Sequence, residues 1–260
     1  MTLSPLVIYP LLGIFGGFIS GLLGIGGGII MAPLLIFVPP FLGLSELSMR
    51  TVSGLTIVQA LVACLVGAMA HNKYEFYSPR LVWIMGPAIF VAALAGGMTS
   101  KWVSNHFLLA LFACLALVAA MFMFLPRNAE DADAPEQEVA FSRAWAVAIA
   151  AAIGLLGGLV GQGGSFILIP LMLYVLHIPT RVAIASNLPV VLMSSSAAFL
   201  GKLGTLQIPL ALAGALVLGV VPGARLGAAL SRRMDVRALR VILALLISLA
   251  AVRIWMKVLL

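Results

Sequence analysis

The stretch from Gly13 to Phe37 constrains the fold most, because it is apolar throughout and is nevertheless interrupted by glycine. Four closely spaced glycines and a following proline mark the interruption: Gly24, Gly26, Gly27, Gly28 and Pro33. Each glycine weakens a helix interior by roughly 0.5–1 kcal/mol and allows the backbone to approach a ligand closely. The stretch therefore predicts an apolar helix that breaks and restarts.

A second copy of this element begins at Gly154 and reads GLLGGLVGQGGSFILIPLMLY. Placing Gly24 on Gly161 brings further positions into register: Gly26 with Gly163, Gly27 with Gly164, Gly28 with Ser165 and Pro33 with Pro170. Beyond it, Arg50 aligns with Arg181 and Gly96 with Gly227 at one constant offset. Two glycine-broken segments at matching places in two halves are the sequence pointer to a transporter's binding site.

The composition predicts an integral membrane protein. Hydrophobic residues make up 63% of the chain and charged residues 9%, and the mean hydropathy is +1.20, whereas soluble domains carry about 25% charge. We therefore expect an all-α, multi-pass protein of the cell (inner) membrane in contact with lipid. The net charge of +7 is spread over short connections as topology signals, and it does not form the basic patch that nucleic-acid binding requires.

The predicted organisation is two homologous halves, each with one glycine-interrupted element and three transmembrane helices. The first repeat covers residues 1–126, an acidic and proline-containing linker covers 127–143, and the second repeat covers 144–260. The N-terminus has no Lys or Arg ahead of its apolar run, which favours an uncleaved first membrane segment over a signal peptide.

The orientation of the halves depends on the interrupted elements. If each crosses the membrane fully, the repeats are parallel, and the Lys and Arg of the connections divide evenly between the two sides. If each is a re-entrant hairpin, the repeats are inverted, and one side collects nine of these residues. The other side then keeps Arg50, Lys101, Lys202, Arg253 and Lys257. The uneven distribution satisfies the positive-inside rule better, so we favour inverted repeats.

A helix that breaks and restarts leaves its first N–H groups without internal partners. Together with the helix dipole, these groups form an anion site, and in lipid they are tolerated only when buried in protein or lining a cavity. We expect both restarts to point at one midplane site, formed by Gly26, Gly27, Gly28, Gly163, Gly164 and Ser165. The alternative is close helix packing, which accounts well for Gly13, Gly17, Gly21, Gly154 and Gly158.

Several uncharged polar side chains lie close to the predicted breaks, namely Ser53, Thr56, Gln59, Gln162, Ser186 and Asn187. Serine and threonine in membrane helices often bond to their own backbone instead of a ligand. Asn187 is the stronger candidate, because an amide in hydrocarbon needs partners. The serines at 194–196 fit packing better than binding.

Arg225 is the only charge that the sequence places within a segment. It can balance an anion or reach the interface by snorkelling. No acidic residue is expected in mid-helix, so the sequence offers no proton relay. Because the cell interior is negative, each unit of negative charge that leaves gains about 2.3 kcal/mol per 100 mV. This favours efflux of an anion.

The paired GxGG elements with their prolines, the AIASN stretch and the PGARLG run resemble the TauE/SafE family of sulfite and sulfonate exporters. The resemblance extends over nearly the whole chain. It implies transport of a small organosulfur compound or sulfur oxyanion, with the two halves rocking around the site in alternating access. An anion channel and an importer of a related anion are the alternatives.

An enzyme is not expected. The GQGGS sequence around Ser165 is superficially similar to a nucleophile turn, but a triad needs a base, and His71, His106 and His177 all lie near segment ends. Cys64 and Cys114 lie within apolar helices, so neither a disulfide nor a metal site is expected from them, and we expect no cofactor. The oligomeric state stays open, with a homodimer as one arrangement.

Overall fold

The computed structural model describes residues 4–23, 28–70, 78–124, 141–231, 245, 248–249 and 252–256, and in these ranges it contains helices and no strand. The helices are α1 (Pro5–Leu23), α2 (Gly28–Phe41), α3 (Met49–Ala70), α4 (Pro79–Thr99), α5 (Asn105–Phe124), α6 (Arg143–Val160), α7 (Ser165–Tyr174), α8 (Thr180–Gly204) and α9 (Leu210–Ser231). Within the described ranges, α1, α3, α4, α5, α6 and α9 are long and apolar enough to cross a membrane. The predicted all-α membrane fold is confirmed.

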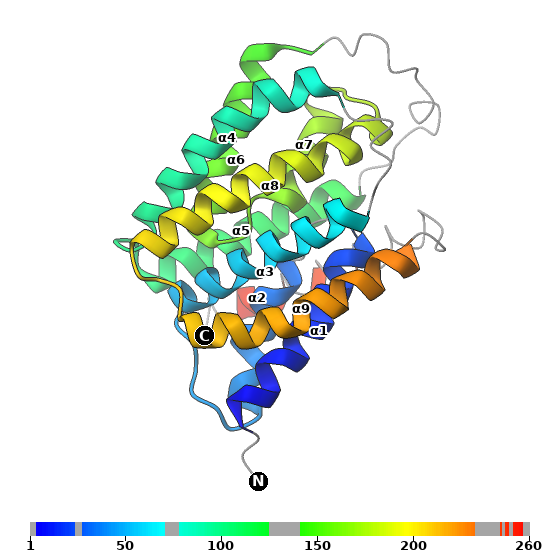
Figure 1. Ribbon diagram of the computed structural model, residues 1–260. Coiled ribbons are helices and arrows are strands. Elements are labelled where there is room, and N and C mark those ends of the chain that lie inside the picture. The colour runs from blue at the N-terminus through cyan, green and yellow to red at the C-terminus, as the bar shows by residue number, and fades with distance from the viewer. Residues whose placement is uncertain are drawn as a thin grey trace.

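Helices α1 and α9 form one of two closely packed pairs (Figure 1). Glycines of α1 lie directly against the backbone of α9, where a Cβ added at Gly17 would stand 2.6 Å from the Val220 carbonyl oxygen. Gly13 and Gly21 face Leu216 and Ala224 in the same way. Small residues at such contacts let helix backbones approach, which is how helices associate in lipid. The packing role predicted for these glycines is confirmed.

Helices α4 and α6 form the second close pair. Gly158 of α6 lies against the Ala93 carbonyl of α4, and Gly96 of α4 lies against Leu155 of α6. In the predicted duplication α6 corresponds to α1 and α4 corresponds to α9, so the two close pairs join equivalent helices crosswise between the halves.

Helices α3 and α8 lie between the two pairs, with α3 also packed on α9 and α8 on α4 (Figure 1). They run in opposite directions in this view. These two helices are also equivalents in the predicted duplication. The inverted relation of the halves stays a prediction, and the opposed directions of α3 and α8 agree with it.

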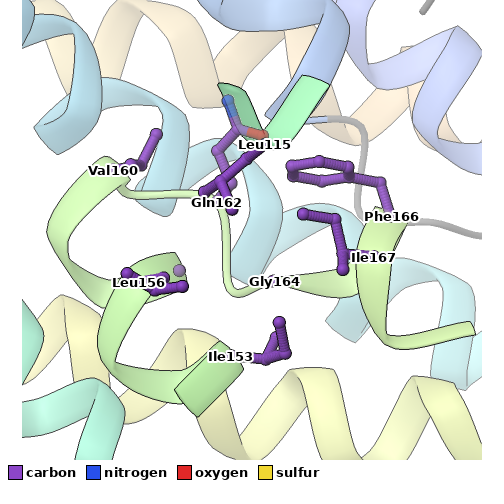
Figure 2. A pocket seen from close by; sticks show the side chains of 9 residues that line it. Leu115, Ile153, Leu156, Val160, Gln162, Gly164, Phe166 and Ile167 are labelled. Carbon is purple, nitrogen blue, oxygen red and sulfur yellow. The ribbon is translucent and has the colours of Figure 1, made fainter. Parts of the chain in front are cut away.

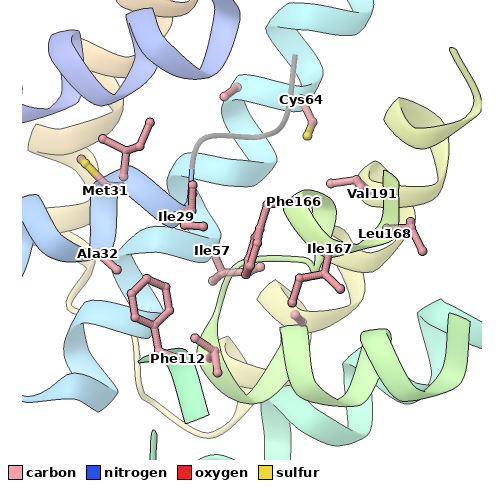
Figure 3. Close-up of a cluster of buried hydrophobic side chains, with 14 of the residues drawn as sticks. Ile29, Met31, Ala32, Ile57, Cys64, Phe112, Phe166, Ile167, Leu168 and Val191 are labelled. Atoms are coloured by element: carbon pink, nitrogen blue, oxygen red, sulfur yellow. The ribbon is translucent and has the colours of Figure 1, made fainter. Parts of the chain in front are cut away.

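The apolar core lies around the short helices α2 and α7, both packed inside the bundle (Figure 3). Ile29 and Met31 of α2, Phe166 of α7 and Phe112 of α5 are buried in one cluster, and Ile57 of α3 lies among them. In a membrane bundle such side chains stabilise the helix contacts through close van der Waals packing. The core holds both short helices, and therefore the glycine interruption at residues 161–164, away from the surface.

Candidate substrate site at the interrupted helix

The interruption in the second half lies at the predicted glycines. Helix α6 ends at Val160, and the N–H groups of Gly161 and Gln162 both donate to the Gly157 carbonyl oxygen, at 2.8 and 2.9 Å. Gly161, Gly163 and Gly164 have φ of 78°, 63° and 73°. This left-handed backbone costs other residues about 1–2 kcal/mol each. The GQGG sequence therefore stops one helix and starts another within four residues.

Three other helices contact this interruption. Gly161 lies against the Ser53 carbonyl of α3, and a Cβ on Gly163 would stand 2.5 Å from the Ser195 hydroxyl of α8. Gly28, the first residue of α2, lies against Gln162, whose Cβ and Cγ would be 3.2 Å from an added Cβ. The start of α2 and the α6–α7 interruption are thus adjacent, and both halves contribute to one buried region.

The described helices contain buried polar atoms without hydrogen-bond partners, and two of the residues concerned, Gln162 and Ser195, lie at this interruption. Both side-chain polar atoms of Gln59 and of Gln162 are unpartnered, as are Asn187 Oδ1 and the hydroxyls of Ser194 and Ser195. All five side chains are at most 1% exposed. An unsatisfied buried polar group costs about 1–3 kcal/mol. A polar ligand that bonded to these groups would remove that cost, so the arrangement is suited to binding one.

Three other predicted residues already have partners. The Ser53 hydroxyl donates to the Arg50 carbonyl oxygen at 2.8 Å, and the Thr56 hydroxyl donates to the Ser53 carbonyl oxygen at 3.2 Å. The Ser186 hydroxyl accepts from the backbone N–H of Ser78 at 3.0 Å and so supports the start of α4. Ser53 and Thr56 bond to the backbone of their own helix, which is the alternative that the sequence left open, whereas Ser186 bonds to the backbone before α4.

The remaining predicted residues are distributed as follows. Gly26 and Gly27 lie outside the described residues, and Ser165 is the first residue of α7. Gly164 lies against Ile153 of α6. Arg225 is exposed on the outside of α9 and does not join the buried polar groups. The assignment of all these residues to substrate binding stays a prediction.

A small pocket lies beside the interruption, between α5, α6 and α7 (Figure 2). Its walls are mainly apolar, with Ile153, Leu156 and Phe166 among the lining side chains. The amide of Gln162 points away from Ile153 and Leu156, on the opposite side of the α6–α7 connection. The pocket therefore lies on one side of the α6–α7 connection, and the amide of Gln162 lies on the other side.

The sequence-based interpretation of Lys202 as a connection residue is wrong. Lys202 lies within α8 and its side chain is fully buried, so Arg225 is not the only charge within a helix. Ser195 was also missed as a neighbour of the interruption. Ser195 and Lys202 are seven positions apart, which is about two helical turns and places both on one face of α8. That spacing was the available signal.

Buried, unpartnered polar groups around an interrupted helix, inside a bundle of apolar helices, are features of a membrane transporter. A match to the family described as sulfite exporter TauE/SafE covers residues 9–254. The chain therefore belongs to the TauE/SafE family of membrane transporters.

Curated relatives carry matching names. The chain is 25% identical to the probable membrane transporter protein YunE of Bacillus subtilis, over 94% of each chain. It is 21% identical to a probable membrane transporter protein of Methanocaldococcus jannaschii, over 94% of this chain and 92% of the relative. A probable membrane transporter protein of Haemophilus influenzae is 29% identical over 44% of each chain. No solved structure gives a significant match.

Proposed function

We propose that this protein exports a small sulfur-containing anion, such as sulfite or a sulfonate, across the inner membrane. The observation that carries the proposal is the unpartnered amide of Gln162 within the α6–α7 interruption, together with the unpartnered Ser195 hydroxyl that lies against Gly163. Gln59 and Asn187 carry further unpartnered buried groups. Amide N–H and hydroxyl groups donate to the oxygens of sulfite or a sulfonate. The N-terminal ends of α2 and α7 add backbone N–H groups and positive dipole ends that favour negative charge.

The transport step is alternating access, in which the two halves rock around the site. The crosswise pairs α1–α9 and α4–α6 each join one helix of the first half to one of the second. The opposed directions of α3 and α8 (Figure 1) support an inverted relation between the halves. In transporters built from inverted repeats, such bundles move against each other while the midplane site stays fixed.

Export is the favoured direction. An anion leaving a negative interior gains about 2.3 kcal/mol per charge per 100 mV. Among the described residues, Glu46 is the only carboxylate side chain, and it lies exposed in the connection before α3. An intramembrane carboxylate relay, which proton-coupled uptake commonly uses, is therefore not present in the described helices.

The test is a binding and flux screen of the purified full-length chain with sulfite, sulfate, thiosulfate, taurine and sulfoacetate. We expect at least one sulfur anion to raise the thermal unfolding midpoint, because a ligand that binds only the folded state stabilises it by mass action. In proteoliposomes the same anion should show saturable flux and counter-transport, which separate a carrier from a channel.

Sodium chloride at matched ionic strength and liposomes without protein are the controls for this screen. No shift and no flux with any of the five compounds would contradict the proposed function. Flux that does not saturate and shows no counter-transport would support a channel instead.

A further inference from the structure

We propose that the Lys202 ammonium is the fixed positive charge of the transport site and sets its preference for anions over solutes without net charge. This inference rests on the proposed function and deepens it, because it names the residue that would make binding depend on the charge of the substrate. It concerns a side chain that neither the glycine motifs nor the family match identifies.

Lys202 is held in place entirely by neutral oxygens. Its Nζ donates to the Ser100 hydroxyl at 2.7 Å, to the Ser53 hydroxyl at 3.0 Å and to the Leu159 carbonyl oxygen at 3.2 Å. These acceptors come from α3, from the end of α4 and from α6, so the ammonium joins three helices. All three of its N–H groups are used, and the side chain is fully buried.

The described hydrogen-bond acceptors of this ammonium are two hydroxyls and a backbone carbonyl oxygen, and none of them is a carboxylate. Bringing an unpaired ammonium into a low-dielectric interior costs several kcal/mol. Leu159 lies in the last turn of α6, so the negative end of that helix dipole offsets part of the cost. A second cation, Arg50, lies one turn before Ser53 and has a buried Nε without a partner among the described residues. The described side-chain hydrogen bonds of both cations therefore go to neutral oxygens.

The charge lies beside the unpartnered polar groups. Leu159, which accepts from Lys202, is three residues before Gln162, and Ser53, which also accepts, lies against Gly161. On α8 itself, Ser195 is on the same face as Lys202, about two turns or ~10 Å away. An anion at Gln162 and Ser195 would thus be attracted by a buried cation whose described hydrogen bonds all go to neutral oxygens.

A network of hydrogen bonds fixes the position of the ammonium. The Ser100 hydroxyl contacts the Gly97 carbonyl oxygen and Gln207 Oε1, both at 2.7 Å. Gln207 Nε2 donates to the Gly97 carbonyl oxygen at 3.0 Å and to the Thr205 hydroxyl at 2.6 Å. The Ser100 hydroxyl, which accepts from Lys202, is thus fixed by hydrogen bonds of its own. This keeps the ammonium in one position, as a preorganised charge requires.

The experiment measures the binding affinity of Lys202→Met and of wild type for three compounds. Two are sulfonates of similar size, sulfoacetate with two negative charges and taurine without net charge, and the third is sulfite. At an effective dielectric of ~20, one charge at ~10 Å changes affinity by about tenfold. We expect Lys202→Met to bind sulfite and sulfoacetate about tenfold or more weakly, and to leave taurine affinity nearly unchanged. The matched control is Lys101→Met, which removes an exposed lysine and should bind all three as wild type does.

Lys202→Gln is the second variant, because it keeps hydrogen-bonding groups near Ser53 and Ser100 while removing the charge. If Lys202→Met does not fold, Lys202→Gln carries the comparison, and its folding is checked by size-exclusion profile and thermal unfolding. Unchanged sulfite and sulfoacetate binding in a folded charge-neutral variant would overturn the inference and leave the proposed function standing. Wild type that binds none of the compounds would instead contradict the proposed function.

Discussion

Replacing Gly161 with valine is expected to abolish anion binding and transport. Gly161 has φ of 78°, and an added Cβ would overlap the Ser53 carbonyl oxygen. The left-handed backbone costs a β-branched residue about 1–3 kcal/mol, and overpacking against α3 costs about 1–3 kcal/mol more. Both costs apply where α6 ends, so the valine moves the interruption away from α3. Thermal unfolding of the purified variant and sulfite flux in proteoliposomes measure the two effects.

Gly204→Val is the matched control. Gly204 ends α8, its φ is not in the left-handed range, and an added Cβ there would meet nothing within 4 Å. It should lower the unfolding midpoint little and leave flux close to wild type. Wild-type flux through Gly161→Val would show that the left-handed turn at α6 is not required.

Replacing Gln162 with leucine should raise stability and abolish binding at the same time. Both side-chain polar atoms of Gln162 are buried and unpartnered among the described residues, so an apolar side chain of similar size removes a cost of about 1–3 kcal/mol for each unsatisfied group. The same change removes an amide that would bond to the anion. Gln59→Leu should behave in the same way, because its amide is equally buried and unpartnered.

Gln207→Leu provides the contrast. This glutamine is also buried, but its amide bonds to Gly97, Ser100 and Thr205. Its removal leaves partners unsatisfied and should destabilise the protein by about 1–3 kcal/mol. Gln162→Leu should therefore raise the thermal unfolding midpoint, and Gln207→Leu should lower it. A destabilised Gln162→Leu that still transports would contradict a binding role for this amide.

Much of the fold follows from the spacing of small residues. Glycines four apart, as in Gly13, Gly17 and Gly21, mark one helix face, and that face packs on α9 as predicted. The GQGG sequence likewise identifies the interruption, because consecutive left-handed positions can be occupied only by glycine at low cost. These features depend on residues close together in the chain, so a single sequence is enough to predict them.

The charged part of the site could not be predicted in this way. Lys202 lies two residues before the end of α8, where a lysine usually extends to water. Its burial depends on Ser100 and Leu159, which reach it from other helices. Arg225 shows the reverse case, since it lies well inside α9 but on a face that no other described helix covers. Which face of a helix is buried depends on its neighbours in space.

The central claim is that a sulfur oxyanion binds at the polar groups beside the α6–α7 interruption, and locating a bound anion tests it most directly. Selenite replaces the sulfur of sulfite with an atom whose anomalous scattering can be located in crystals of the full chain grown with it. We expect one anomalous peak within hydrogen-bond reach of Gln162 and Ser195, absent from crystals of Gln162→Leu. A peak confined to exposed cations such as Arg225, unchanged in Gln162→Leu, would contradict the account.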